Sequence, residues 1–327
     1  MTPLTDRFGR TFPYLRLSVI DACNFRCSYC LPDGYRAAHG RAKHLELDEI
    51  ARLLRAFARA GMRKVRITGG EPSLRRDLTA IIGVGATTPG VETVALTTNG
   101  SVLPQRIDEW IDAGLRALNV SVDTLDAHAF ARITGHDRLG EILQGVERAR
   151  ARRLPSIKLN AVLLRGLNDD QLPTWLDYLR DRDVGVRFIE LMQTGDNRAY
   201  FEKHHLRAET LEAQLVDAGW SLRPRAPDAG PAREYVHPEY AGRIGIIAPY
   251  SRDFCAGCNR LRVTSTGDLR LCLFGDFGIA LRPLLQRDDQ AEELLAVLVS
   301  QLGLKKATHG LHEGNTGITP HLASIGG

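Results

Sequence analysis

Residues 15–30 read LRLSVIDACNFRCSYC, and this stretch is the most informative part of the sequence about fold and chemistry. It begins with an apolar, β-branched run, Leu15–Ile20, and ends with three cysteines at C-x3-C-x2-C spacing, Cys23, Cys27 and Cys30. The run predicts a buried β-strand with the cysteines at its carboxyl end. Three thiolates can hold three irons of a [4Fe-4S] cube and leave the fourth iron open to another ligand. We therefore expect a metal site with a vacancy for chemistry.

The other three cysteines form a second triplet, Cys255, Cys258 and Cys272. Six cysteines in a short secreted protein would suggest three disulfides, but this chain has 327 residues, shows no signal-peptide pattern and clusters its thiols at ligand spacing. Metal binding is the better interpretation of both triplets. Zinc stays open as the alternative, because a histidine can complete three cysteines to a closed zinc site. The candidate histidines are His44, His309, His312 and His321.

The composition is that of an ordinary globular chain, with 43% hydrophobic and 25% charged residues. Its length predicts about two domains, which we place at residues 1–215 and 216–327. The net charge of +4 is too small for a surface that coats nucleic acid. The sequence also holds no uncharged apolar run of about 18 residues. We expect a cytoplasmic protein that binds neither nucleic acid nor a membrane.

From residue 15 to about residue 191 the chain repeats one unit, an apolar run, a polar or glycine-rich turn and an amphipathic helix. Six such units predict a parallel sheet covered by helices, either doubly wound or curled into an incomplete barrel. In the first expected helix, apolar residues recur from Ile50 to Phe57 at helical spacing. Asp48 is its expected N-cap and Gly61 its stop. The expected strands are Leu15–Ile20, Lys64–Thr68, Val91–Thr97, Ala117–Val122, Ile157–Leu163 and Val184–Leu191.

Five of these strands are followed by a motif that is unusual for a plain turn. In parallel α/β folds chemistry collects at the carboxyl ends of strands, and in a barrel those ends meet at one mouth. Each motif alone is typical of a turn or a helix cap, but five in register favour a barrel with one shared site. The motifs are Cys23–Cys30, Gly69–Pro72, Thr97–Gly100, Ser121–Asp123 and Glu190–Met192.

The cysteine spacing with Tyr29 before its last cysteine, together with Gly-Gly-Glu-Pro at residues 69–72, resembles the radical S-adenosylmethionine (SAM) superfamily. The resemblance implies an incomplete (βα)6 TIM-like barrel, with Cys23, Cys27 and Cys30 as ligands of a [4Fe-4S] cluster whose open iron is chelated by SAM. It also implies that an electron delivered to this cluster cleaves SAM to a 5′-deoxyadenosyl radical. The SAM contacts that it implies are Tyr29, Gly70, Ser121 and Met192.

The second triplet lies on two alternating β-type segments around a Thr-Gly-Asp turn at residues 266–268. A hairpin would fold Cys272 back toward Cys255 and Cys258, so that the three thiols could share one metal. Arg260 and Arg262 are two residues apart and share one face, where they can present two guanidinium groups to one anion. A solvated basic edge is the alternative for this pair. Beside a half-open cluster, a phosphate clamp is the better interpretation.

This second half, with its terminal Gly326 and Gly327, is similar to the family of radical SAM enzymes that begin molybdenum cofactor biosynthesis by cyclising GTP. The resemblance implies a smaller C-terminal α+β domain that closes the barrel mouth, and a second [4Fe-4S] cluster that binds the guanine of GTP. A Gly-Gly tail would reach into the active site. Cationic side chains on barrel strands are costly to bury unpaired, and the phosphates of GTP would supply their anionic partner. The implied GTP contacts are Arg16, Arg66, Thr97, Lys158, Arg260, Leu261 and Arg262.

The implied reaction turns GTP into (8S)-3′,8-cyclo-7,8-dihydroguanosine 5′-triphosphate, after the 5′-deoxyadenosyl radical removes the ribose H3′. The resemblance also implies a homodimer, an electron donor of the reductase or flavodoxin type, and transfer of the product to cyclic pyranopterin monophosphate synthase. Two alternatives stay open. One is a peptide-modifying radical SAM enzyme with an auxiliary cluster, which usually has more than three C-terminal cysteines. The other is a non-catalytic metal-binding protein.

Three local features of the sequence carry further expectations. The basic segment Tyr35–His44 is expected to form a mobile flap over the barrel mouth. The histidines between residues 309 and 321 are expected to be surface residues, because the thiols already account for both clusters. Gln193 stands where we expect a proline after Glu-Leu-Met, so the local turn is left open.

Overall fold

The structure is a computed structural model that describes residues 3–36, 43–225 and 229–325. The expected tail glycines, Gly326 and Gly327, and residues 37–42 of the expected flap lie outside the described residues. Six adjacent parallel strands form the centre of the sheet. Each begins and ends within two residues of its expected run. They are β1 (Tyr14–Ile20), β2 (Lys64–Gly69), β3 (Thr93–Thr98), β4 (Ala117–Ser121), β5 (Ser156–Leu163) and β6 (Gly185–Glu190).

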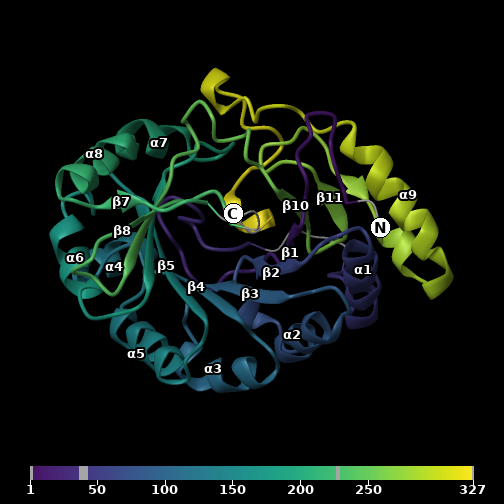
Figure 1. Ribbon diagram of the computed structural model, residues 1–327, viewed down its shortest axis with the longest axis horizontal. Helices are drawn as coiled ribbons and strands as arrows, with labels where there is room; N and C mark the ends of the chain where they lie inside the picture. Colours follow the sequence, from purple (N-terminus) through teal and green to yellow (C-terminus); the bar gives the residue numbers. More distant parts are fainter. Residues whose placement is uncertain (1–2, 37–42, 226–228, 326–327) are drawn as a thin grey trace.

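Helices cover the outer face of this curled sheet, and the C-terminal end of the described chain lies inside the ring (Figure 1). The apolar core therefore lies between the strands and the helices, as expected for a barrel rather than a doubly wound sheet. The sheet ends at β12 and β7, so within the described residues the barrel stays incomplete. The covering helices are α1 (Leu47–Arg59), α2 (Leu78–Thr87), α3 (Leu103–Asp112), α4 (Ala127–Thr134), α5 (Leu139–Ala151) and α6 (Leu172–Leu179).

Helix α1 tests the local expectations of the sequence. Gly61, with φ +89°, follows the C-cap residue and stops the helix as expected. The expected N-cap is wrong, because Glu46 caps the helix in a reciprocal capping box with Glu49. Asp48 lies instead in the first turn, where its charge still favours the helix dipole.

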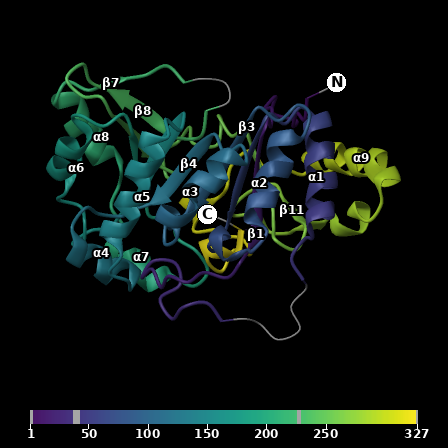
Figure 2. The ribbon, with the colours of Figure 1, turned by 90° about the horizontal axis from the view of Figure 1, so that it is seen from below.

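The C-terminal third adds strands to both edges of the barrel sheet. Strand β9 pairs parallel with β6, and β10 pairs parallel with β1. Helix α9 packs on α1 outside the barrel (Figures 1 and 2). No helix of the described chain is long and apolar enough to cross a membrane. The added elements are α7 (Arg198–His204), α8 (Glu209–Asp217), β7 (Ser221–Leu222), β8 (Arg233–Val236), β9 (Arg243–Ile247), β10 (Arg260–Val263), β11 (Asp268–Arg270), β12 (Ile279–Ala280) and α9 (Ala291–Leu302).

Candidate active site

The first cysteine triplet lies in the loop that follows β1, and its three thiols are free and partly buried. The loop is tied to the end of α4, since the backbone N–H of Ser28 donates to the Ile133 carbonyl at 2.8 Å. Between the cysteines, Phe25 is buried and stacks on His136, with ring centroids 4.6 Å apart. The thiols are thus held on a loop that packs against the end of α4.

The glycine pair after β2 holds the same loop from the other side. The backbone N–H of Gly70 donates to the Ile20 carbonyl at 2.9 Å, and that of Glu71 donates to the Ala22 carbonyl at 2.8 Å. A Cβ on Gly70 would lie 2.2 Å from the Ala22 oxygen, so only glycine fits this approach. Glu71 is buried and its carboxylate accepts from the Asn99 backbone at 2.6 Å. The motif therefore joins the carboxyl ends of β1, β2 and β3.

Three of the predicted SAM contacts lie at the strand ends around this loop. The Tyr29 hydroxyl donates to Asp123 at 3.1 Å, and Asp123 also accepts from the Val162 backbone at 2.9 Å. Burial raises the pKa of Asp123 to about 6 and that of Tyr29 well above its usual value. Ser121 is the last residue of β4, and Met192 follows β6. The structure brings these residues to one end of the barrel.

The second triplet is assembled by the expected hairpin, because β10 and β11 pair antiparallel. Cys255, Cys258 and Cys272 line one pocket inside the barrel. Burial opposes ionisation of Cys258, yet Arg260 and Lys305 lower its pKa to about 7. A thiol with a lowered pKa is a good metal ligand, because the thiolate is the binding form.

The residues present fit iron–sulfur clusters better than zinc. Within the described chain, no three His, Cys, Asp or Glu side chains gather closely enough to hold one metal ion. His44 Nε2 lies 3.5 Å from Asp21 Oδ1, and His309 Nε2 lies 2.9 Å from the Pro249 carbonyl oxygen. Neither histidine therefore completes a triplet, whereas a four-iron cluster spreads three thiolates over separate irons.

The expectation for the tail histidines is correct for His312, which is exposed, and wrong for His309. His309 is 7% exposed and lines the pocket of the second triplet. Its Nδ1 accepts from the Leu311 backbone at 3.0 Å, so both ring nitrogens are engaged in fixing a turn. Sequence spacing carried no sign of this packing.

The pocket of the second triplet is rich in cations that come from neighbouring strands. Arg16 of β1 is in register with Arg66 of β2 and with Arg262 of β10. The Tyr14 hydroxyl accepts from Arg66 Nε at 2.5 Å. Burial opposes ionisation of Tyr14, but Arg66 and Arg16 lower its pKa to about 6. The cations that line the pocket are Arg16, Lys64, Arg66, Arg187, Arg260 and Arg262.

The remaining predicted GTP contacts lie close to this set, with one exception. Thr97 Oγ1 accepts from Arg66 Nη1 at 3.2 Å. Lys158 Nζ lies 3.1 Å from Glu234 Oε1, and burial lowers the pKa of Lys158 to about 7. Leu261 is 1% exposed and its side chain packs in the apolar core, so only its backbone remains for a ligand.

Sequence reasoning missed four residues of this region, Tyr14, Lys64, Arg187 and Glu234. Arg187 carried a usable signal, because it interrupts the apolar run of β6 as Arg16 interrupts that of β1. Glu234 carried none, since its four-residue strand has no continuous apolar run and finds its place by pairing with β7 and β9.

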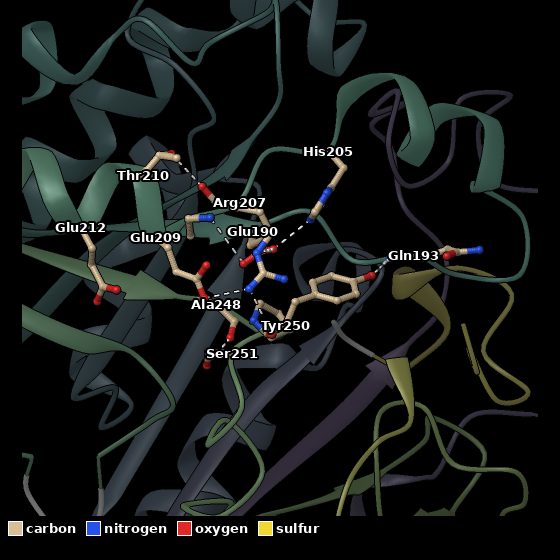
Figure 3. Close-up of polar contacts among 12 residues, drawn as sticks. Glu190, Gln193, His205, Arg207, Glu209, Thr210, Glu212, Ala248, Tyr250 and Ser251 are labelled. Carbon is tan, nitrogen blue, oxygen red and sulfur yellow. Dashed lines mark hydrogen bonds and ion pairs between the residues drawn. The ribbon is translucent and has the colours of Figure 1, made fainter. Parts of the chain in front are cut away.

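The end of β6 is anchored by the network in Figure 3. Glu190 is buried, and its carboxylate contacts His205 at 2.9 Å and Arg207 at 3.5 Å. The backbone N–H of Gln193 donates to the Tyr250 hydroxyl at 3.1 Å (Figure 3). A proline has no N–H to donate, so this bond gives the departure from proline at Gln193 a structural role.

The last described turn of the chain, Leu322–Ile325, lies inside the barrel (Figure 1). The backbone amides of Leu322 and Ala323 form hydrogen bonds to the Cys30 thiol, and they oppose the rise in its pKa that burial causes. Ile325 is buried in an apolar cluster against which Cys272 packs. This turn therefore lies between the two triplets.

Comparison with known proteins agrees with this geometry. The Radical SAM superfamily model matches residues 17–179, and the Molybdenum Cofactor Synthesis C model matches residues 184–311. Among solved structures, SuiB of Streptococcus suis bound to S-adenosylmethionine matches with a TM-score of 0.60 at 13% identity, over 89% of this chain and 68% of that chain, which shows the shared fold alone.

Relatives over the full length are much more similar. The GTP 3′,8-cyclase of Aeromonas hydrophila is 57% identical over 331 residues, which cover 100% of this chain and 97% of the relative. The GTP 3′,8-cyclase of Stenotrophomonas maltophilia strain R551-3 is 68% identical over 327 residues, 100% of both chains. With both cysteine triplets on one barrel and this identity over its whole length, the chain belongs to the GTP 3′,8-cyclase family of radical SAM enzymes, which acts in molybdenum cofactor synthesis.

Proposed function

We propose that this chain binds GTP in the pocket beneath the second triplet and cyclises it to (8S)-3′,8-cyclo-7,8-dihydroguanosine 5′-triphosphate. The observation that carries the proposal is one pocket lined by Cys255, Cys258 and Cys272 and by arginines from β1, β2 and β10. Thiols at one side suit a cluster that takes the guanine, and guanidinium groups suit the triphosphate. Holding GTP at both ends would leave its ribose facing the first triplet.

At the first triplet, Cys23, Cys27 and Cys30 would hold the [4Fe-4S] cluster, and Tyr29, Gly70, Ser121 and Met192 would contact SAM. When bound, cluster and SAM together supply the radical chemistry. The protein's own contribution is position. Asp123 orients Tyr29, and Gly70 lets the cysteine loop and β2 approach each other.

Other parts of the proposal rest on family membership. We propose that the chain has two domains, residues 1–215 and 216–327, and that it forms a homodimer. We also propose an electron donor of the reductase or flavodoxin type. Cyclic pyranopterin monophosphate synthase would receive the product. The peptide-modifying alternative has only the likeness to SuiB in its favour, and at 13% identity that likeness concerns the fold.

Anaerobic turnover tests the proposal directly. Reduced, reconstituted protein with SAM and GTP should give 5′-deoxyadenosine together with the cyclised nucleotide. SAM cleavage that is indifferent to GTP would refute the assignment. Cys272→Ala should keep the iron and the spectrum of the first cluster and lose GTP-dependent turnover; full turnover in this variant would remove the second cluster from the substrate site.

A further inference from the structure

Glu234 is a carboxylate on β8, the last strand but one of the sheet, and it reaches toward the cations of the barrel. It pairs with Gly245 across β8 and β9, and Gly245 in turn pairs with Arg187 across β9 and β6. A Cβ on Gly245 would lie 3.1 Å from the Arg187 side chain. Because the strand between them carries no side chain at this position, Glu234 can reach Arg187 across it.

The Glu234 carboxylate bridges two cations with one oxygen. Its Oε1 lies 3.1 Å from Lys158 Nζ and 3.5 Å from Arg187 Nη2. The three side chains are 24%, 18% and 11% exposed in the order Glu234, Lys158, Arg187. Burial would raise the pKa of Glu234, but Lys158 and Arg187 lower it overall. The carboxylate is therefore ionised at neutral pH.

The same two cations adjoin the proposed phosphate site, Lys158 as a predicted GTP contact that is not among the residues lining the pocket. Arg187 lines the pocket, and the charge of Arg66 acts on both Arg187 and Lys158. One oxygen shared by an ammonium and a guanidinium group is also the arrangement that a bound phosphate oxygen would adopt. The Glu234 carboxylate and a substrate phosphate therefore compete for the same donors.

We propose that Glu234 is an internal counter-anion that substrate phosphates must displace from Lys158 and Arg187, and that it thereby lowers the affinity of the pocket for nucleotides. Without substrate, Glu234 offsets the mutual repulsion of Lys158 and Arg187. A ligand that takes these donors gains affinity only by the surplus of its own attraction over that of the displaced carboxylate. This inference rests on the proposed function of the pocket.

If Glu234 had a purely structural role, its removal would change nucleotide affinity in the opposite direction. If Glu234 only held Lys158 and Arg187 in place for phosphate, its removal would disorder them and weaken nucleotide binding. If it competes with phosphate, its removal strengthens binding. The direction of the change separates the two roles.

The test is nucleotide binding to anaerobically reconstituted protein without SAM, measured by equilibrium dialysis with GTP and with GDP. Glu234→Gln should bind GDP about tenfold more tightly, which corresponds to about 1.4 kcal/mol. Because displacement of the carboxylate costs both nucleotides alike, GTP should gain by a similar factor. Unchanged or weaker binding of both nucleotides by Glu234→Gln would overturn the proposal.

Two further variants keep the result specific. Glu212→Gln removes a carboxylate from α8 that contacts Arg233 and Tyr235 of the same strand β8, and it should leave both affinities unchanged. An equal gain in Glu212→Gln would reduce the effect to overall charge and overturn the proposal. Glu234→Asp keeps the charge but withdraws it by one methylene, and it should tighten GDP binding less than Glu234→Gln does.

Failure of the proposed function would give a different set of binding results. If the unaltered protein bound no GTP, or if Lys158→Ala bound it equally well, the phosphate site itself would be misplaced. If the unaltered protein bound GTP through Lys158 and Glu234→Gln bound neither nucleotide more tightly, only the role of Glu234 would fail.

Discussion

Single residues decide the chemistry of this barrel because its strands carry cations where apolar side chains would be expected. Lys158 is the most responsive of them, since burial, with a further contribution from Arg187, lowers its pKa to about 7. Below pH 7 the free protein carries this charge, and above pH 7 it loses it. A bound phosphate would raise the pKa again, so GTP binding above pH 7 should take up a proton.

We therefore expect the dissociation constant of GTP to rise roughly tenfold between pH 6.5 and pH 8.5. Isothermal titration calorimetry in buffers of different ionisation enthalpy would measure both the affinity and the proton uptake. Lys158→Arg is the matched control, because a guanidinium group stays charged over this range. An equally steep pH dependence in Lys158→Arg would assign the titration to another group.

Asp123 fixes the surroundings of the first triplet through hydrogen bonds to Tyr29 and Val162 rather than through its charge. Asp123→Ala leaves the Val162 amide without its acceptor and releases the Tyr29 hydroxyl. We expect a loss of about 1–3 kcal/mol in stability and weaker SAM binding, because Tyr29 is a proposed SAM contact. Asp126→Ala, in the same loop, removes only the N-cap of α4 and should destabilise without changing SAM affinity. Equal SAM affinity in Asp123→Ala and the unaltered protein would contradict this role.

At the scale of elements, the six barrel strands could be predicted because each is a short, mostly apolar run between turn signals. The hairpin of β10 and β11 could be predicted because its turn is local. The pairing of β10 with β1 and of β9 with β6 could not, since it joins segments far apart in the sequence by backbone hydrogen bonds that leave no pattern in the side chains. Glu234 was missed for the same kind of reason, because β8 comes to lie beside the barrel cations only through its pairing with β9.

The glycine pair after β2 was also only partly understood from sequence. The sequence predicts that it lets backbone approach a ligand, and the structure adds that Gly70 lets β2 approach the chain's own cysteine loop. Gly70→Ala should lower the apparent midpoint of unfolding by an amount equivalent to about 2–3 kcal/mol and reduce the iron content, because the added Cβ would overlap the Ala22 carbonyl.

Gly83→Ala provides the matched control for that substitution. Gly83 is inside α2, and a Cβ there meets no atom within 4 Å. It should raise stability by about 0.5–1 kcal/mol, because alanine favours a helix over glycine. Thermal unfolding with iron analysis of both variants measures the contrast, and a Gly70→Ala protein with full iron content would show that the two loops can separate at little cost.

At the scale of the whole molecule, the chain returns to its own beginning. Strand β10 pairs with β1, and the turn Leu322–Ile325 lies against β1 and β2 inside the barrel. The first ligand loop is thereby covered by the last part of the described chain. The environment of the first cluster should therefore depend on residues that are about 300 positions away in the sequence.

Ending the chain at Pro320 tests this dependence. The truncated protein should still bind the first cluster, since the three cysteine side chains and their loop remain, but Cys30 loses the amides of Leu322 and Ala323. Hydrogen bonds to the ligand sulfur stabilise the more negative, reduced cluster. Loss of these bonds should therefore lower the reduction potential of the first cluster. One such bond of about 1 kcal/mol corresponds to about 40 mV for one electron, and anaerobic redox titration followed by electron paramagnetic resonance would resolve it.

Ile325→Ala keeps both amides and trims only the apolar contact, so its potential should match that of the full chain. Equal potentials in the full chain and the truncated protein would show that these amides do not act on the cluster.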